Sequence, residues 1–291
     1  MKKPIEELLK FGILNIDKPS GPTSFDISHF IHKKLAKYGI KKTSHFGTLD
    51  PMVTGVLPIA LGRACKFTGF FLGHDKEYIG VMHVHKENAL EILQKIIDEN
   101  FVGKIMQLPP KKSSVKRAVR EREIKKFELL EIDEKDFLFL TEVQGGTYIR
   151  KLLHDLGERE EVGGAHMAEL RRVRAGVFSE EDKEFRNLYD FEKALEDFEN
   201  GDETLLREMI TPAGDAIKKV MKVLQLNVDA KRLKELLTGK KLIRKDFDKI
   251  VGLGEGEDFA VFNKENFVEI AERLPGNSPN SFFARPKFVF N

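Results

Sequence analysis

The stretch "SHFGTLDPMVTGVLP", residues 44–58, places one acidic residue, Asp50, among glycine, proline and apolar side chains. A carboxylate in apolar surroundings is costly unless something pairs with it. Gly47 and Gly55 let the backbone approach another group closely, and Pro51 fixes the chain just after the carboxylate. An aspartate that caps a turn would produce the same spacing. The stretch alone therefore leaves both a structural and a chemical role open for Asp50.

Length and composition indicate a globular chain with room for a main domain and a smaller one. The 291 residues are 41% hydrophobic and 33% charged, which is enough to bury a core. No apolar run approaches the roughly 20 residues of a membrane helix, and the N-terminus has no apolar stretch typical of a signal peptide. The single cysteine, Cys65, can form no internal disulfide. We therefore expect a cytoplasmic location and no membrane partner.

Charge is distributed unevenly along a chain whose formal net charge is only +2. Residues 111–126 hold eight lysines and arginines against two glutamates, and residues 231–249 are also basic. Residues 180–208 hold twelve acidic side chains against four basic ones. Basic patches on a nearly neutral protein favour a face that binds a polyanion, although a solvated surface of mixed charge fits the composition equally well.

Hydrophobic periodicity predicts alternating strands and helices in the first part of the chain. Strands are expected at 13–16, at 76–85 and on both sides of a turn at 133–136. Helices are expected after a cap at Thr23 or Ser24, within 87–101, and within 147–157. The acidic stretch beyond 180 predicts surface helices.

A Pro/Gly break at 211–216 predicts two domains, 1–215 and 216–291. The second has a helix near 229–237 and short strand-like pieces, so we expect it to be mostly β. The glycine-rich run at 252–257 lacks a following helix and a GK[ST] motif, and we interpret it as a turn. His83 and His85 share a strand face, but no acidic or sulfur ligand accompanies them at metal-site spacing, so no metal site is predicted.

Five stretches in order resemble the TruB family of pseudouridine synthases. "HFGTLDPMVTGVLP" matches the family signature HxGxLDPxxxGxLP, in which the aspartate is catalytic. The other four are "NIDKPSGPTS", "KEYIG", "PPKKSSVKR" and "GGTYIRKLLHDLG", and the resemblance covers roughly residues 12–178. It implies an α/β (α+β) domain on a mixed, largely antiparallel sheet. It also implies isomerisation of uridine to pseudouridine in RNA, with neither a cofactor nor a catalytic metal.

The resemblance also assigns roles to individual residues. Asp50 would act on the ribose as nucleophile or base, Arg150 would pair with it, and Tyr78 would stack on the flipped uracil and help to remove its C5 proton. Substrate-binding roles fall to His45 (base flipping), Leu153 and Leu170 (apolar pocket wall), and Lys18 (support of the Asp50 loop). The basic residues expected to contact RNA phosphate are Lys111, Lys112, Lys116, Arg117 and Arg120.

Within the family, "GGAHMAELRRVRAG" at 163–176 is similar to the dyskerin branch, the catalytic subunits of box H/ACA ribonucleoproteins. Only 30 residues separate Tyr78 from Pro109, whereas stand-alone TruB enzymes carry long insertions that embrace tRNA. The resemblance thus implies that a box H/ACA guide RNA and three small proteins present the substrate. These would be a zinc-ribbon-type protein, a glycine-arginine-rich β-barrel protein and a kink-turn-binding ribosomal-type protein. The absence of lysine-rich tails favours an archaeal-type chain.

Residues 216–291 resemble a PUA domain, the small RNA-binding β-barrel of these enzymes, although only Gly239 stands where a glycine-rich, proline-containing turn is usual. Two alternatives remain open. One is a stand-alone tRNA pseudouridine synthase, and the other is an RNA-binding scaffold without catalysis. The presence of Asp50, Tyr78 and Arg150 together counts against the scaffold.

Overall fold

The computed structural model describes residues 3–110, 116–250, 252–276 and 282–290. The chain forms two compact units, which divide between Thr211 and Pro212, four residues before the expected boundary at 215. Each unit is described by itself. No helix in these described ranges is long and apolar enough to cross a membrane.

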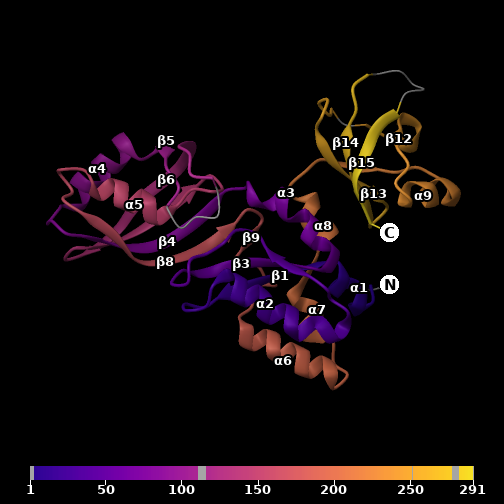
Figure 1. The fold of residues 1–291 in the computed structure, drawn as a ribbon, viewed down its shortest axis with the longest axis horizontal. Coiled ribbons are helices and arrows are strands. Elements are labelled where there is room, and N and C mark those ends of the chain that lie inside the picture. The colour runs from indigo at the N-terminus through magenta and orange to yellow at the C-terminus, as the bar shows by residue number, and fades with distance from the viewer. Residues whose placement is uncertain (1–2, 111–115, 251, 277–281, 291) are drawn as a thin grey trace. The chain divides into compact units, whose positions relative to one another are not determined.

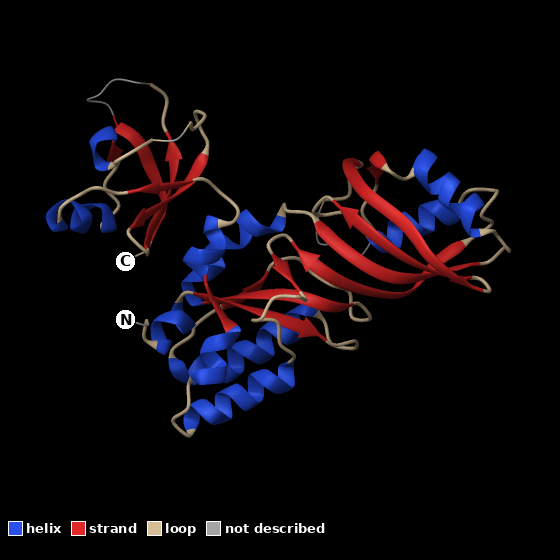
Figure 2. Ribbon diagram, turned by 180° about the vertical axis from the view of Figure 1, so that it is seen from behind, coloured by secondary structure: helices blue, strands red, loops and turns tan. Residues whose placement is uncertain are grey.

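The first unit is built on a sheet of ten strands (Figures 1 and 2). Eight follow one another in the order β10 (Ile210–Pro212), β1 (Gly12–Lys18), β3 (Thr54–Leu61), β8 (Ala165–Ala175), β4 (Lys76–Val84), β7 (Asp136–Val143), β6 (Arg120–Asp133) and β5 (Gly103–Gln107). Two short strands pair at the side: β2 (Thr43–His45) with β3, and β9 (Phe178–Ser179) with β8.

Strand direction confirms the expected fold class. The β1–β3, β4–β7, β4–β8, β5–β6 and β6–β7 pairs are antiparallel, and the short β3–β8 pair is parallel. The sheet is therefore mixed and largely antiparallel. The parallel pair joins β3, which follows the Asp50 loop, to β8, which in turn pairs with β4, the strand that carries Tyr78.

Helices cover the sheet near both of its ends (Figure 1). They are α1 (Ile5–Lys10), α2 (Ser24–Leu35), α3 (Thr68–Leu72), α4 (Leu90–Asn100), α5 (Ile149–Gly157), α6 (Leu188–Glu199) and α7 (Thr204–Met209). Thr23 is the N-cap of α2, because its side chain accepts a hydrogen bond from the backbone of Asp26 in a capping box. The expected helices within 87–101 and 147–157 are present as α4 and α5, and α6 and α7 occupy the acidic stretch.

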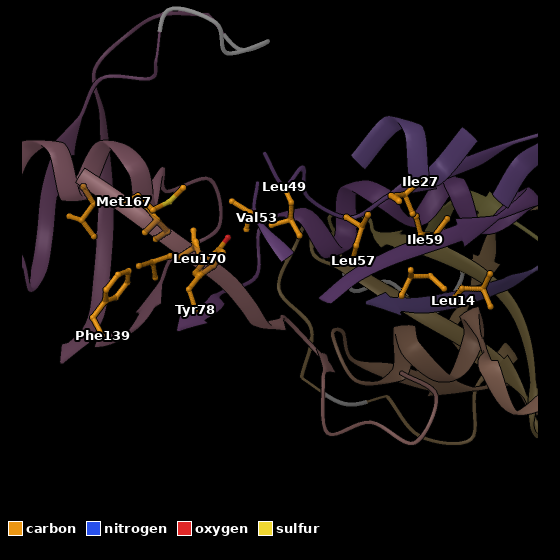
Figure 3. Close-up of a cluster of buried hydrophobic side chains, with 14 of the residues drawn as sticks. Leu14, Ile27, Leu49, Val53, Leu57, Ile59, Tyr78, Phe139, Met167 and Leu170 are labelled. Atoms are coloured by element: carbon orange, nitrogen blue, oxygen red, sulfur yellow. The ribbon is translucent and has the colours of Figure 1, made fainter. Parts of the chain in front are cut away.

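One hydrophobic core runs along the first unit. Figure 3 shows Leu49 and Val53 of the Asp50 loop between two groups of buried side chains, one around Leu57 and Ile59 and the other around Tyr78. Since Leu49 and Val53 flank Asp50, the apolar neighbours that made the sequence conspicuous belong to this core. They fix the loop in place by burial of apolar surface.

The second unit contains a five-stranded sheet in the order β11 (Val223–Gln225), β13 (Asp258–Asn263), β14 (Asn266–Arg273), β15 (Phe282–Val289) and β12 (Leu242–Ile243). The helices α8 (Ala213–Lys218) and α9 (Ala230–Leu237) accompany it. The segment expected as a break at 211–216 therefore contains the start of a helix. Gly214 is needed in α8 because a Cβ there would lie 2.9 Å from the Cβ of Phe267.

Candidate active site

A cavity of about 720 Å³ opens in the first unit. Its wall is formed by the Asp50 loop, by β4 and β8, and by the segment that joins β7 to α5. Of the residues predicted from sequence, the cavity brings together Asp50, Tyr78, Arg150 and Leu170. These residues are up to 120 positions apart in the chain, so the sheet and α5 are what assemble them.

Asp50 and Arg150 form an ion pair, with 3.1 Å between Oδ2 of the carboxylate and Nη2 of the guanidinium. Arg150 is the second residue of α5, which directs it to the cavity. The Asp50 side chain is 41% exposed and that of Arg150 is 54% exposed. The enclosure that the apolar sequence suggested is thus not present around the carboxylate. Leu49 and Val53 are buried in the core, and Asp50 points the other way, into the open cavity.

The segment at 18–24 supports the Asp50 loop from beneath. Lys18 is fully buried, and its Nζ donates hydrogen bonds to the backbone oxygens of Pro51 at 2.9 Å and Val53 at 2.8 Å. The Ser24 hydroxyl and the Leu49 backbone hydrogen-bond each other. Burial lowers the pKa of Lys18, and the charge of Asp50 acts in the opposite direction. Lys18 does not line the cavity, so the geometry gives it a supporting contact rather than a substrate contact.

Tyr78 and Leu170 face the same cavity from neighbouring strands. Both side chains are buried, and Figure 3 shows them together, with Val53 nearby. Gly80 is paired with Leu170 across β4 and β8. A Cβ at Gly80 would come within 2.9 Å of the Leu170 side chain, so the glycine is what lets the two strands pack here.

Two predicted substrate contacts lie elsewhere. Leu153 is fully buried in the core under α5 and does not line the cavity. His45 ends β2, its Nε2 is 3.0 Å from the Thr48 hydroxyl, and it does not line the cavity. Burial lowers the pKa of His45, and the positive charge of Arg172 lowers it further.

The basic stretch at 111–126 is only partly described. Lys111 and Lys112 fall outside the described residues. Lys116 and Arg117 are exposed, and Arg120 lines a small pocket of about 80 Å³ beside the main cavity. Lys125 and Lys126 form ion pairs with Asp75 and Glu128, respectively. Within the described part of the stretch, Lys116 and Arg117 are therefore exposed cations that form no ion pair with a described residue.

The sequence interpretation missed two buried cations, Lys76 and Arg172, which also line the cavity. Lys76 stands two residues before Tyr78 on β4, and alternate residues of a strand share a face. The position of Lys76 on the same face as Tyr78 could therefore have been predicted from this spacing. The inward position of Arg172 depends on its pairing with Tyr78 across β4 and β8, which no local pattern reveals.

The histidines gather more closely than their spacing suggested. His83 and His85 meet His166 of β8, with ring centroids 5.2 to 5.9 Å apart. Nδ1 of His83 is 2.6 Å from the Asp136 carboxylate. Across the ranges described, however, no group of three or more His, Cys, Asp or Glu residues could hold a metal ion.

Comparison with family models covers most of the first unit. Residues 33–149 match the N-terminal domain of the TruB family of pseudouridylate synthases, and residues 150–218 match the C-terminal domain of tRNA pseudouridylate synthase B. Residues 1–28 match the DKCLD (NUC011) domain. The matched ranges contain Asp50, Tyr78 and Arg150.

Curated relatives come from archaea and are named probable tRNA pseudouridine synthase B. The protein of Methanopyrus kandleri is 45% identical over 226 residues, which are 76% of this chain and 64% of the relative. That of Methanothermobacter thermautotrophicus is 43% identical over 79% of this chain and 69% of its own length. The chain thus spans about two thirds of the length of these relatives.

Solved structures agree with the sequence matches. A chain of a Cbf5-Nop10-Gar1 complex superposes with a TM-score of 0.88 and 33% identity, over 99% of this chain and 87% of that one. A chain of an H/ACA RNP bound to a substrate RNA containing 2'-deoxyuridine gives 0.87 and 32%, over 100% and 88%. The chain therefore belongs to the TruB family of pseudouridylate synthases.

Proposed function

We propose that the chain is an RNA pseudouridine synthase that isomerises uridine to pseudouridine in ribosomal or transfer RNA, guided by a box H/ACA RNA. The observation that carries this proposal is the Asp50–Arg150 ion pair in a cavity that also holds Tyr78 and Leu170. Membership of the TruB family supports the reaction type. The similarity to a chain of an H/ACA RNP that binds substrate RNA supports the guided mode.

The cavity suits a nucleotide that has left its stack, which costs a few kcal/mol. Its volume of about 720 Å³ admits a base with its ribose. The Tyr78 ring stacks on the uracil, and Leu170 supplies the apolar wall beside it. The Asp50 carboxylate is accessible from the cavity and acts on the ribose as nucleophile or base, while Arg150 orients it through a charge-assisted hydrogen bond.

The isomerisation balances without an oxidant or reductant. The N1–C1′ bond breaks, the base turns over, and C5 bonds to C1′. The proton lost from C5 is matched by a proton gained at N1. We assign Tyr78 to the removal of the C5 proton, because its hydroxyl lies on the wall where the turned base would present that carbon.

The substrate is a folded RNA held by surfaces beyond the cavity. We assign phosphate contacts to Lys116, Arg117 and Arg120, together with Lys111 and Lys112. The first unit would be the catalytic domain and the second a PUA-like RNA-binding domain. The partners would be the guide RNA and the three small H/ACA proteins, and the single cysteine favours a cytoplasmic setting.

A stand-alone tRNA pseudouridine synthase is the second candidate, and the names of the curated archaeal relatives favour it. The two candidates share the chemistry of Asp50, Tyr78 and Arg150. They differ in what presents the uridine to the cavity.

The deciding experiment supplies the full chain with an H/ACA guide RNA and the three partner proteins. Primer-extension mapping after carbodiimide treatment then locates pseudouridine in the substrate. Moving the pairing arms of the guide should move the modified position with them, and Asp50→Asn should abolish product while RNA affinity stays within about threefold of the parent. Efficient tRNA modification that ignores every guide would favour the stand-alone enzyme. Normal turnover by Asp50→Asn would refute the chemistry.

A further inference from the structure

Two buried cations line the cavity, and the chemistry proposed above does not use them. Lys76, the first residue of β4, is 4% exposed, and Arg172 of β8 is 1% exposed. Both stand in the cavity wall beside Tyr78. Taking a cation out of water costs several kcal/mol per ion. Their position therefore calls for a compensating interaction.

No carboxylate supplies that compensation, because the ion pairs formed among the described residues include neither Lys76 nor Arg172. Their donors end on backbone oxygens instead. Nζ of Lys76 donates to the Leu72 carbonyl at 2.8 Å and also to those of Phe71 and His74. Nε and Nη2 of Arg172 donate to the carbonyls of Val56 at 2.7 Å and Gly47 at 3.0 Å. These contacts satisfy hydrogen bonding but leave both positive charges in place.

The two cations are held close together beside Gly47. The position that a Cβ of Gly47 would occupy is 3.3 Å from Nη1 of Arg172 and 3.8 Å from Cε of Lys76. Gly47 has a φ of +104°, which a side chain would strain. Arg172 is also paired with Tyr78 across β4 and β8. The pair therefore lies against the ring on which the substrate base is expected to stack.

The described wall of the cavity carries an excess of positive charge. Among the described residues of the wall, Asp50 supplies the carboxylate, and Arg150 already pairs with it. Lys76 and Arg172 remain as a surplus. Fixed charges in a site that excludes water interact strongly with charge that develops during a reaction, and they need no reorganisation to do so. A surplus of cations thus favours an anionic species in the cavity.

We propose that Lys76 and Arg172 form a cation pair that stabilises the negative charge on the uracil ring while it is detached from the ribose. The inference rests on the proposed function. When the N1–C1′ bond breaks, its electron pair stays on N1, and the charge spreads to O2 and O4. The charge disappears when C5 bonds to C1′. Loss of the C5 proton and gain of a proton at N1 then complete the isomerisation, so no further reactant is required.

The test compares RNA with uridine or 5-fluorouridine at the target position. Fluorine withdraws electron density, so the detached 5-fluorouracil anion needs less stabilisation than that of uracil. Arg172→Gln and Lys76→Met should each slow single-turnover loss of the N-linked nucleoside by about tenfold or more with uridine. With 5-fluorouridine the same variants should slow this reaction by about threefold or less. Nucleoside chromatography after digestion of the RNA gives both rates.

Two variants serve as controls. Arg172→Lys keeps the charge and should retain more of the uridine rate than Arg172→Gln. Arg174→Gln changes an arginine of the same strand that pairs with Glu77 and Glu142 and does not line the cavity. At pH 7, where Lys76 is charged with or without Arg174, it should leave both rates at the parent level. If Arg172→Gln slows both substrates equally, its role is structural and the inference is wrong. If Arg172→Gln does not fold, as judged by circular dichroism, Lys76→Met carries the same comparison.

The pH profile provides an independent readout. Burial first, and then the charges of Arg172 and Arg174, lower the pKa of Lys76 to about 8 against the opposing charge of Asp75. Asp75 is itself paired with Lys125 of β6. Lys76 is charged below pH 8 and loses its charge above it, so the parent rate should fall above about pH 8. Arg172→Gln should move this fall in rate to higher pH, and Lys76→Met should abolish it. An unchanged fall in rate in Lys76→Met would contradict the inference.

Different outcomes overturn the proposed function and the inference about Lys76 and Arg172. A parent chain that forms no pseudouridine with any guide overturns the proposed function and this inference together. An active parent that is silenced by Asp50→Asn, with equal losses on both substrates in the Lys76 and Arg172 variants, overturns the inference alone.

Discussion

Glu269, in β14 of the second unit, allows a stability effect to be worked out from the structure. Its side chain is fully buried, and neither carboxylate oxygen has a hydrogen-bond partner among the residues described. Burial first, and then the nearby charge of Asp246, raise the pKa of Glu269 to about 8 against the opposing charge of Arg232. The folded unit therefore holds a neutral carboxylic acid up to about that pH.

The sign and size of the effect follow from linkage. A glutamate in the unfolded chain titrates near 4.5, and the folded value is about 8. The stabilisation from protonation is fully present below pH 4.5 and is lost as pH rises through 8, because the unfolded state then gains by ionising. At about 1.4 kcal/mol per pH unit, the free energy of unfolding should fall by on the order of 5 kcal/mol across this window.

Glu269→Gln removes the titration and should flatten this fall. Hydrogen exchange of β14 backbone amides at several pH values, corrected for intrinsic exchange, reads the stability of the second unit separately from the first. Glu272→Gln is the matched control, because Glu272 lies on the same strand and pairs with Arg285. Glu272→Gln should leave the pH dependence of stability between pH 5 and 8 the same as in the parent. A Glu269→Gln variant that loses stability with pH as steeply as the parent would refute the reasoning.

Two further outcomes are expected. Replacing Arg117 and Arg120 with Ala should lower the slope of log affinity against log salt by about 1.5 for every RNA sequence tested, since each lost phosphate contact removes about 0.7–0.9; an unchanged slope would assign these residues to the solvated surface. Lys18→Met should leave the Val53 carbonyl without its donor, at a cost of about 1–3 kcal/mol, whereas the Pro51 carbonyl keeps the Gly21 backbone N–H. Thermal unfolding should show this loss, and turnover should fall more than RNA affinity, whereas Lys33→Met on the exposed face of α2 should change neither.

Elements with a strong local signal could be predicted from the sequence. The cap at Thr23, the apolar face of α2 and the end of α5 at Gly157 each depend on residues within a few positions of one another. Local hydrogen bonds and periodicity decide such features. The motif around Asp50 was equally informative about the family, because its residues follow one another within one short loop.

Strand β8 shows where local reasoning stops. Its sequence holds Arg171, Arg172 and Arg174, which reads as a charged surface segment, yet it lies in the middle of the sheet between β3 and β4. Arg171 pairs with Asp17 and Glu180, and Arg174 pairs with carboxylates on β4 and β7. These partners are up to 154 positions away. The ion pairs that compensate the charge of this central strand therefore cannot be predicted from neighbouring residues in the sequence, because the folded sheet is what brings the partners together.

The way the cations are held explains how Asp50 stays available. Backbone carbonyls hold Lys18, Lys76 and Arg172, and none of the three forms an ion pair with the carboxylate among the described residues. Among the described residues, Arg150 is the ion-pair partner of Asp50, and its side chain is more than half exposed. An exposed ion pair is worth about 1 kcal/mol or less, so the pair can open toward a ribose at small cost. If the proposed function holds, positive charge would stay directed at the base while the carboxylate acts on the sugar.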